Sequence, residues 1–158
     1  MASFAPIPTE HRVNAASARD FILAGNATFT LRSLKTGNRY TYKVEIDPRP
    51  GPGKPVMWFA MLLTGPENTS DYTYIGAIFT QADGTLRFRT TSASKMPATS
   101  TPVVAFAWAF GSIIRGQEPK NAEIWHVGRC GRCGRVLTVP ESVALGIGPE
   151  CARRGAGA

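Results

Sequence analysis

Residues 27–46 read ATFTLRSLKTGNRYTYKVEI and predict a β-hairpin on which the rest of the fold builds. In the first half, apolar Phe29 and Leu31 alternate with polar side chains, and the alternation returns over residues 39–46. A period of two places successive side chains on opposite faces of a strand. The Lys-Thr-Gly-Asn stretch between the halves has the residues of a tight reversal. We therefore expect two antiparallel strands here.

Three more strand-like segments follow this hairpin, at residues 56–63, 72–79 and 85–90. Residues 56–63 (VMWFAMLL) are apolar at every position, which is typical of a central strand covered on both faces. The Gln-Ala-Asp-Gly stretch at residues 81–84 predicts another hairpin turn. The sequence thus predicts a five-stranded antiparallel meander.

Helices are expected before and after this meander in the chain. Residues 14–24 contain good helix formers and are followed by a glycine, and residues 103–114 (VVAFAWAFGSII) are apolar nearly all round. Pro102 stands where the first turn of the second helix would be. The fold class is α+β, a five-stranded antiparallel sheet with flanking helices, preceded by an irregular arm at residues 1–13.

The composition is that of a soluble globular protein. Hydrophobic residues make up 43% and charged residues 18% of the 158-residue chain, which excludes global disorder. No apolar run approaches the roughly 18 residues of a membrane span, and the N-terminal residues lack the features of a signal peptide. We expect an intracellular protein without a membrane partner.

The three cysteines, Cys130, Cys133 and Cys151, stand close to one of the two histidines, His126. Their spacing, His-x3-Cys-x2-Cys-x17-Cys, supplies the four ligands that tetrahedral zinc takes in structural sites. An odd number of cysteines also argues against a secreted disulfide framework. The sequence therefore predicts a structural zinc ion bound by these four residues.

Alternatives remain open for part of this ligand set. The fourth ligand could instead be His11, Glu150, a water or a residue of another chain. The cysteines could also be free thiols or a redox pair, although the glycines after Cys130 and Cys133 do not suit the helix start of a thioredoxin-type motif.

The cysteine pair has the form of a zinc knuckle, in which a tight turn directs two thiolates at one ion. Thr138 to Glu141 fits a capping box before a short helix that Gly146 would end. Pro149 would begin a further helix that carries Cys151 near its N-terminus, as in a treble clef. We expect three parts, an arm at 1–13, an α+β core domain at 14–121 and a treble-clef-like zinc-binding module at 122–158.

The C-terminal stretch CGRCGRVLTVPESVALGIGPEC, residues 130–151, resembles the signature of an uncharacterised family of small proteins common in actinobacterial phages and related genomes. The shared pattern is a CxxCGR knuckle, then LT-x-PES and GIGP-x-C. The resemblance implies zinc binding and a phage or prophage origin, and hence the cytoplasm of a bacterial host. It implies no activity.

The charge balance favours a polyanionic partner. Eighteen basic and eleven acidic residues give a formal net charge of +7. Five of the basic residues surround the cysteines, and their guanidinium groups are candidates for phosphate contacts; they are Arg129, Arg132, Arg135, Arg153 and Arg154. We expect nucleic acid binding, DNA or RNA, with an ordinary solvated surface as the plain alternative.

The rival function is a phage inhibitor of host defence, comparable to an anti-CRISPR protein, that binds a host nuclease or effector complex. An enzyme is not expected, because the sequence contains no GxSxG, P-loop or HExxH motif and lacks the zinc deaminase signature. No catalytic residue and no small-molecule substrate are predicted.

Overall fold

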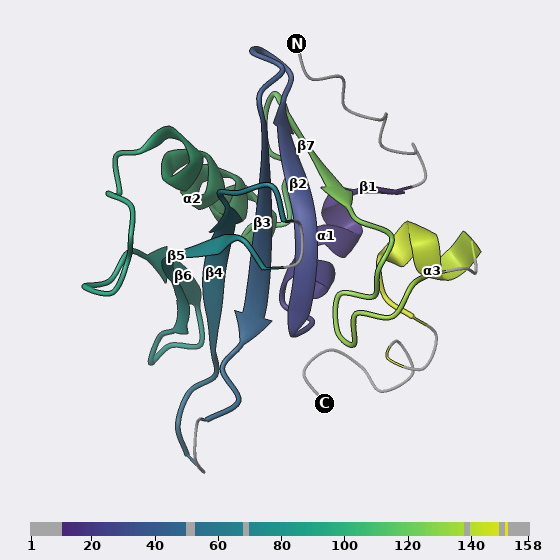
Figure 1. The fold of residues 1–158 in the computed structure, drawn as a ribbon. Coiled ribbons are helices and arrows are strands. Elements are labelled where there is room, and N and C mark those ends of the chain that lie inside the picture. Colours follow the sequence, from purple (N-terminus) through teal and green to yellow (C-terminus); the bar gives the residue numbers. More distant parts are fainter. Residues whose placement is uncertain (1–10, 50–52, 68–69, 138–139, 149–150, 152–158) are drawn as a thin grey trace.

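The computed structural model describes residues 11–49, 53–67, 70–137, 140–148 and 151. Its centre is one antiparallel sheet with the strand order β1-β7-β2-β3-β4-β5-β6 (Figure 1). The strands are β1 (Arg12–Val13), β2 (Asn26–Ser33), β3 (Arg39–Ile46), β4 (Met57–Leu63), β5 (Tyr72–Thr80), β6 (Leu86–Arg89) and β7 (Ala122–His126).

The predicted meander is confirmed in strands β2 to β6, which pair in chain order. Phe29 lies opposite Tyr42, and Leu31 opposite Tyr40. Cross-strand partners share a face of the sheet, so the alternating apolar residues of the first hairpin form one continuous apolar surface.

The prediction of five strands is wrong, because the described sheet has seven. The segment around His126, expected as a short strand of the metal-binding module, pairs with β2 as β7, with Leu31 opposite Ile124. Part of the expected irregular arm forms β1, which pairs with β7. The predicted module boundary at residue 122 thus coincides with the first residue of a sheet strand.

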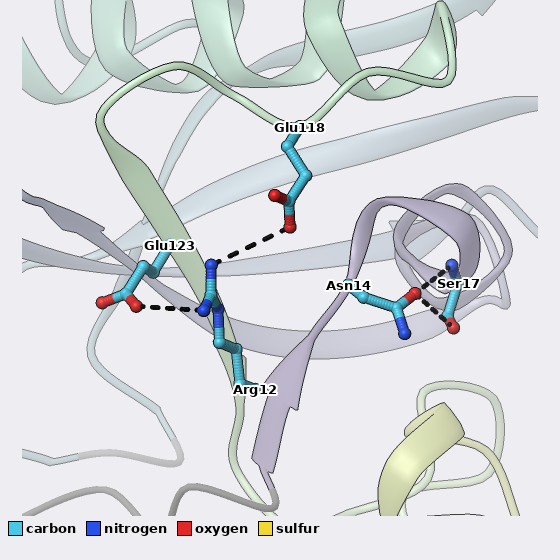
Figure 2. A network of polar contacts seen from close by, with 5 residues as sticks. All are labelled: Arg12, Asn14, Ser17, Glu118 and Glu123. Atoms are coloured by element: carbon cyan, nitrogen blue, oxygen red, sulfur yellow. Dashed lines mark hydrogen bonds and ion pairs between the residues drawn. The ribbon is translucent and has the colours of Figure 1, made fainter.

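Ion pairs fasten the short edge strand β1. The Arg12 guanidinium lies 3.5 Å from Glu123 on β7 and 3.8 Å from Glu118 (Figure 2). Just after β1, the Asn14 side chain accepts hydrogen bonds of 3.0 Å from the backbone N–H and the hydroxyl of Ser17. Asn14 thereby caps the first helix.

Two helices, α1 (Ala15–Ile22) and α2 (Thr101–Ile114), cover one face of the sheet (Figure 1). Phe29 on β2 contacts both, since its ring centroid is 6.3 Å from that of Phe21 on α1 and 6.4 Å from that of Phe106 on α2. Tyr42 is fully buried there, and its hydroxyl donates to Pro102 O at 2.6 Å. The core lies between this face and the helices.

A third helix, α3 (Pro140–Leu145), lies beyond the β1 edge of the sheet (Figure 1). Gly146 follows it with φ of +72°, in agreement with its predicted place at the helix end. None of the helices in the described ranges has the length and apolar run needed to span a bilayer.

Candidate metal centre

The structure brings the three cysteines together. The Sγ atoms of Cys130, Cys133 and Cys151 all lie within 4.8 Å of one another, although Cys151 is 18 positions beyond Cys133. Zinc binds thiolates at about 2.3 Å, so tetrahedral sites hold their sulfurs roughly 3.8 Å apart. The three thiols therefore fit a metal ion with small adjustments. Cys130 and Cys151 are buried, whereas Cys133 is exposed.

A tight turn positions the first two cysteines. Cys130 N–H donates to Arg135 O at 2.8 Å, and Gly134 N–H donates back to Cys130 O at 3.0 Å. Gly134 has φ of +79°, a conformation that side chains disfavour. Within the turn, Arg132 N–H donates to Cys130 Sγ at 3.4 Å. The backbone thus directs a donor at the sulfur, as in a zinc knuckle.

The surroundings of the thiols act in opposite directions on their acidity. Burial alone would raise the pKa of Cys130, but N–H donors from Gly148, Cys133 and Arg132 outweigh it and lower that pKa to about 7. Burial raises the pKa of Cys151 to about 11, and hydrogen bonding and charge on the other two sulfurs add to this. A cation between the sulfurs would replace this mutual repulsion with attraction.

Backbone contacts attach residues 127–151, here called the cysteine segment, to the core. Asn26 N–H at the start of β2 donates to Gly131 O at 2.7 Å, and Gly131 N–H donates to Gly146 O at 2.8 Å. Phe21 of α1 packs against both glycines. A Cβ added to Gly131 would lie 2.8 Å from the Phe21 ring, and one added to Gly146 would lie 2.6 Å from it. Only glycine allows this approach.

The structure does not bring the predicted fourth ligand, His126, into the cysteine group. Its Nδ1 accepts from Gly128 N–H at 2.9 Å, so the ring proton is on Nε2, which donates to Val143 O at 2.5 Å. The ring is 1% exposed. Both nitrogens are thus engaged, Nε2 in joining β7 to α3 and Nδ1 in the turn after β7, and metal ligation would break one of these hydrogen bonds.

His11, one of the alternative ligands, belongs to the expected irregular arm and is half-buried. Its ring stacks on His126 with a centroid distance of 4.6 Å and an angle of 23° between planes. It does not join the cysteine group either. Another alternative ligand, Glu150, lies outside the described residues, as do Thr138 of the expected capping box and Pro149.

The predicted phosphate-binding arginines are partly described. Arg129 and Arg135 are exposed on the knuckle, and Arg132 is half-buried. Arg129 Nη1 donates to Gly134 O at 3.0 Å, which supports the turn. Arg153 and Arg154 lie outside the described residues. The structure thus brings Arg129, Arg132 and Arg135 onto the same turn as the first two cysteines.

Sequence reasoning missed Phe21 as a support of the site. It lies more than 100 positions before the first cysteine, and only the close approach of its ring to Gly131 and Gly146 connects the two regions. The one signal in the sequence is the glycine after Cys130, and the tight turn alone is sufficient to explain that glycine.

Comparison with known protein families gives a match in this region of the chain. Residues 121–154 match a family of unknown function, DUF6011. The match covers 34 of the 158 residues and includes His126 and all three cysteines. No curated protein matches the chain significantly, and no solved structure does.

Proposed function

We propose that this protein is a zinc-binding, phage-encoded and non-enzymatic protein that binds nucleic acid through a basic surface on the cysteine segment. The observation that carries the proposal is the convergence of three thiols within 4.8 Å, two of which lie on a turn that also bears arginines. Thiolate ligands in a partly buried site favour zinc over the harder cations. The zinc has a structural role in this proposal, because it holds the turn in place and does not bind a substrate.

The charge of this turn supports a polyanionic partner. Arg129 and Arg135 are exposed at its two ends, where the backbone makes an antiparallel bridge between Arg129 and Val136. Neither arginine forms an ion pair with a carboxylate of the described residues. Arg129 uses one guanidinium N–H on Gly134 O and keeps its other donors, so both arginines can bind phosphate oxygens in a bidentate manner from this turn.

Elemental analysis of the purified protein tests the metal. We expect about one zinc per chain, and loss of zinc in Cys133→Ser, whose exposed position lets the substitution spare the core. His126→Asn should keep its zinc, because the ring is committed to Val143 and Gly128. Loss of zinc in that variant would return His126 to the ligand set, and a wild-type protein without metal would refute the proposal.

Electrophoretic mobility of labelled single- and double-stranded DNA and RNA at low salt tests the partner. Arg129→Gln combined with Arg135→Gln should weaken binding and reduce the slope of log affinity against log salt by about one for each phosphate that the variant no longer binds. The matched control is Arg87→Gln with Arg89→Gln, which removes the same charge from exposed positions of β6, at the far edge of the sheet.

Equal losses in both double variants would reduce the effect to net charge, and no shift of any wild-type complex would refute nucleic acid binding. A pull-down from host lysate treated with nuclease tests the alternative function, inhibition of a host defence protein. A stoichiometric protein partner that persists after nuclease treatment would support the inhibitor function instead.

A further inference from the structure

Helix α2 presents an apolar face to solvent. Its sequence, TPVVAFAWAFGSII, contains no charged residue, and it buries Phe106 and Phe110 against the sheet. The opposite side therefore consists of apolar side chains, with Val104 51% and Trp108 46% exposed. A tryptophan exposed to this degree on an ordered helix offers a flat ring for stacking.

Trp108 forms one wall of a cavity of about 350 Å³. The cavity lies between α2 and the end of the sheet at which β2 ends and β7 begins. Tyr40 of β3 also lines it, and Leu31 contributes to the apolar lining. Ligand pockets in proteins range from roughly 300 to 1,000 Å³ and are mostly apolar with a few polar groups. This cavity is large enough for one nucleotide.

The charged groups of the cavity are all positive. Lys35 and Lys120 line it, both exposed, and no carboxylate does. Neither lysine forms an ion pair with a carboxylate of the described chain. Two ammonium groups that no described carboxylate pairs, beside an aromatic ring, are complementary to a planar ligand that carries a phosphate.

The backbone fixes the positions of both lysines. Lys35 is in the turn between β2 and β3, and Lys120 is in the turn before β7; Figure 1 shows these turns at the same end of the sheet. Leu34 N–H donates to Asn121 O at 2.8 Å and joins the two turns. Asn121 has φ of +60°, uncommon for a residue with a side chain. A backbone hydrogen bond thus holds together the two turns that carry the lysines.

We propose that this cavity binds a nucleotide, with the base stacked on Trp108 and the phosphate between Lys35 and Lys120. The Ser33 hydroxyl and the Asn121 amide, which also line the cavity, can bond to the base edge or the sugar. The nucleotide is either free or part of a single strand. In the second case the inference deepens the proposed nucleic acid binding and rests on it, whereas a free nucleotide does not depend on it.

Tryptophan fluorescence of the full chain tests the proposal directly. Trp58 and Trp125 are each 8% exposed, so Trp108 is the ring that a ligand can reach from solvent. Adenosine 5′-monophosphate and a 12-nucleotide single-stranded DNA are titrated separately at low salt, with adenosine as the uncharged comparison. Saturable quenching that disappears in Trp108→Phe is expected.

Quenching by the mononucleotide would show that a free nucleotide is sufficient to bind the cavity. Quenching by the oligonucleotide alone would show that the ligand is a nucleotide within a single strand. Adenosine should bind about 10-fold more weakly than its monophosphate, because it cannot contact the lysines. Equal affinities would overturn the assignment of the phosphate to Lys35 and Lys120.

The second readout is the affinity of the protein for the oligonucleotide or the mononucleotide, measured by calorimetry. Trp108→Leu and the pair Lys35→Gln with Lys120→Gln should each weaken binding by about 10-fold or more. The matched control, Lys54→Gln with Lys95→Gln, removes two lysines that are exposed and do not line the cavity. Equal losses in control and test pairs would overturn the site.

The two proposals fail in different ways. A mobility shift without any quenching of Trp108 would leave the proposed function standing and refute the nucleotide cavity. Quenching by the mononucleotide without a shift of any polynucleotide would do the reverse. Absence of quenching by both probes together with a stoichiometric protein partner bound at Trp108 would assign the apolar face to a protein.

Discussion

The sheet and the cysteine segment hold their shapes by different means. The sheet and its two helices bury one continuous cluster of aromatic and aliphatic side chains. The described part of the cysteine segment has a single six-residue helix, α3, and depends on turns, backbone hydrogen bonds and three neighbouring thiols. A segment that buries little apolar surface gains too little free energy to offset the entropy lost when its chain becomes ordered. The proposed metal would supply, through its three thiol ligands, the stability that a thin core does not.

Removal of the metal should separate the two regions most strongly. With a chelator, or in Cys151→Ser, we expect the cysteine segment to lose its structure while the sheet stays folded, because zinc binding and local folding are coupled. Hydrogen exchange should show lost protection at Gly131 and Leu137, and retained protection at Phe29 and Val44. Collapse of the whole circular dichroism spectrum would contradict the separation.

Phe21→Ala should damage both regions, because Phe21 belongs to the buried core and also packs against Gly131 and Gly146. Deleting a buried phenylalanine ring costs about 3–5 kcal/mol of unfolding free energy, measured by urea denaturation. Phe110→Ala is the control, since Phe110 is equally buried but on α2. Only Phe21→Ala should also release zinc more readily to a chelator; equal release would show that the regions are coupled throughout.

Gly146→Ala sharpens the contact between the regions. Gly84→Ala is the matched control, because φ is positive at both glycines, +72° at Gly146 and +85° at Gly84. A Cβ at Gly84 would meet nothing within 4 Å. Gly84→Ala should cost about 1 kcal/mol for backbone strain. Gly146→Ala should cost about 1–3 kcal/mol more, because its Cβ would overlap the Phe21 ring. Indistinguishable denaturation midpoints would argue against tight packing there.

The smallest effect concerns acidity at His126. Burial lowers the pKa of His126 below the ordinary value of 6.5; the hydrogen bond to Val143 opposes this and the neighbouring His11 adds to it. As the pH falls, His126 is therefore protonated at a higher pH in the unfolded chain than in the folded protein. The stabilisation is present above pH 6.5 and is lost as the pH falls toward the folded-state pKa.

Thermal melting of the metal-containing protein between about pH 5.5 and 7.5 measures this loss, with the zinc content determined at each pH so that metal release is not counted as part of it. The variant His126→Asn should flatten the dependence. A dependence of the same slope in both proteins would assign it to other groups.

Local patterns were enough to predict most strands and helices. The alternation over residues 39–46 gives β3 with its observed ends, and Pro102 lies in the first turn of α2 as expected. The clustering of Cys130, Cys133 and Cys151 also followed from spacing, since knuckle thiols and a distant cysteine have few other reasons to recur in one segment.

Features that depend on distant contacts were not predictable from these patterns. β1 has two residues, too few for any periodicity, and it forms only because β7 offers an edge. His126 has a ligand's spacing, yet its ring is engaged by Val143 of α3 and Gly128. Spacing fixes which residues can meet, but packing decides which of them do.

The two ends of the strand order bear on the behaviour of the folded protein at high concentration. A sheet edge with free backbone N–H and C=O groups is a template for pairing with another molecule. Here one edge is β1, with two residues, and the other is β6, with four residues and the exposed Arg87 and Arg89. Both edges are short and the β6 edge is also positively charged, so the folded chain should resist edge-to-edge aggregation.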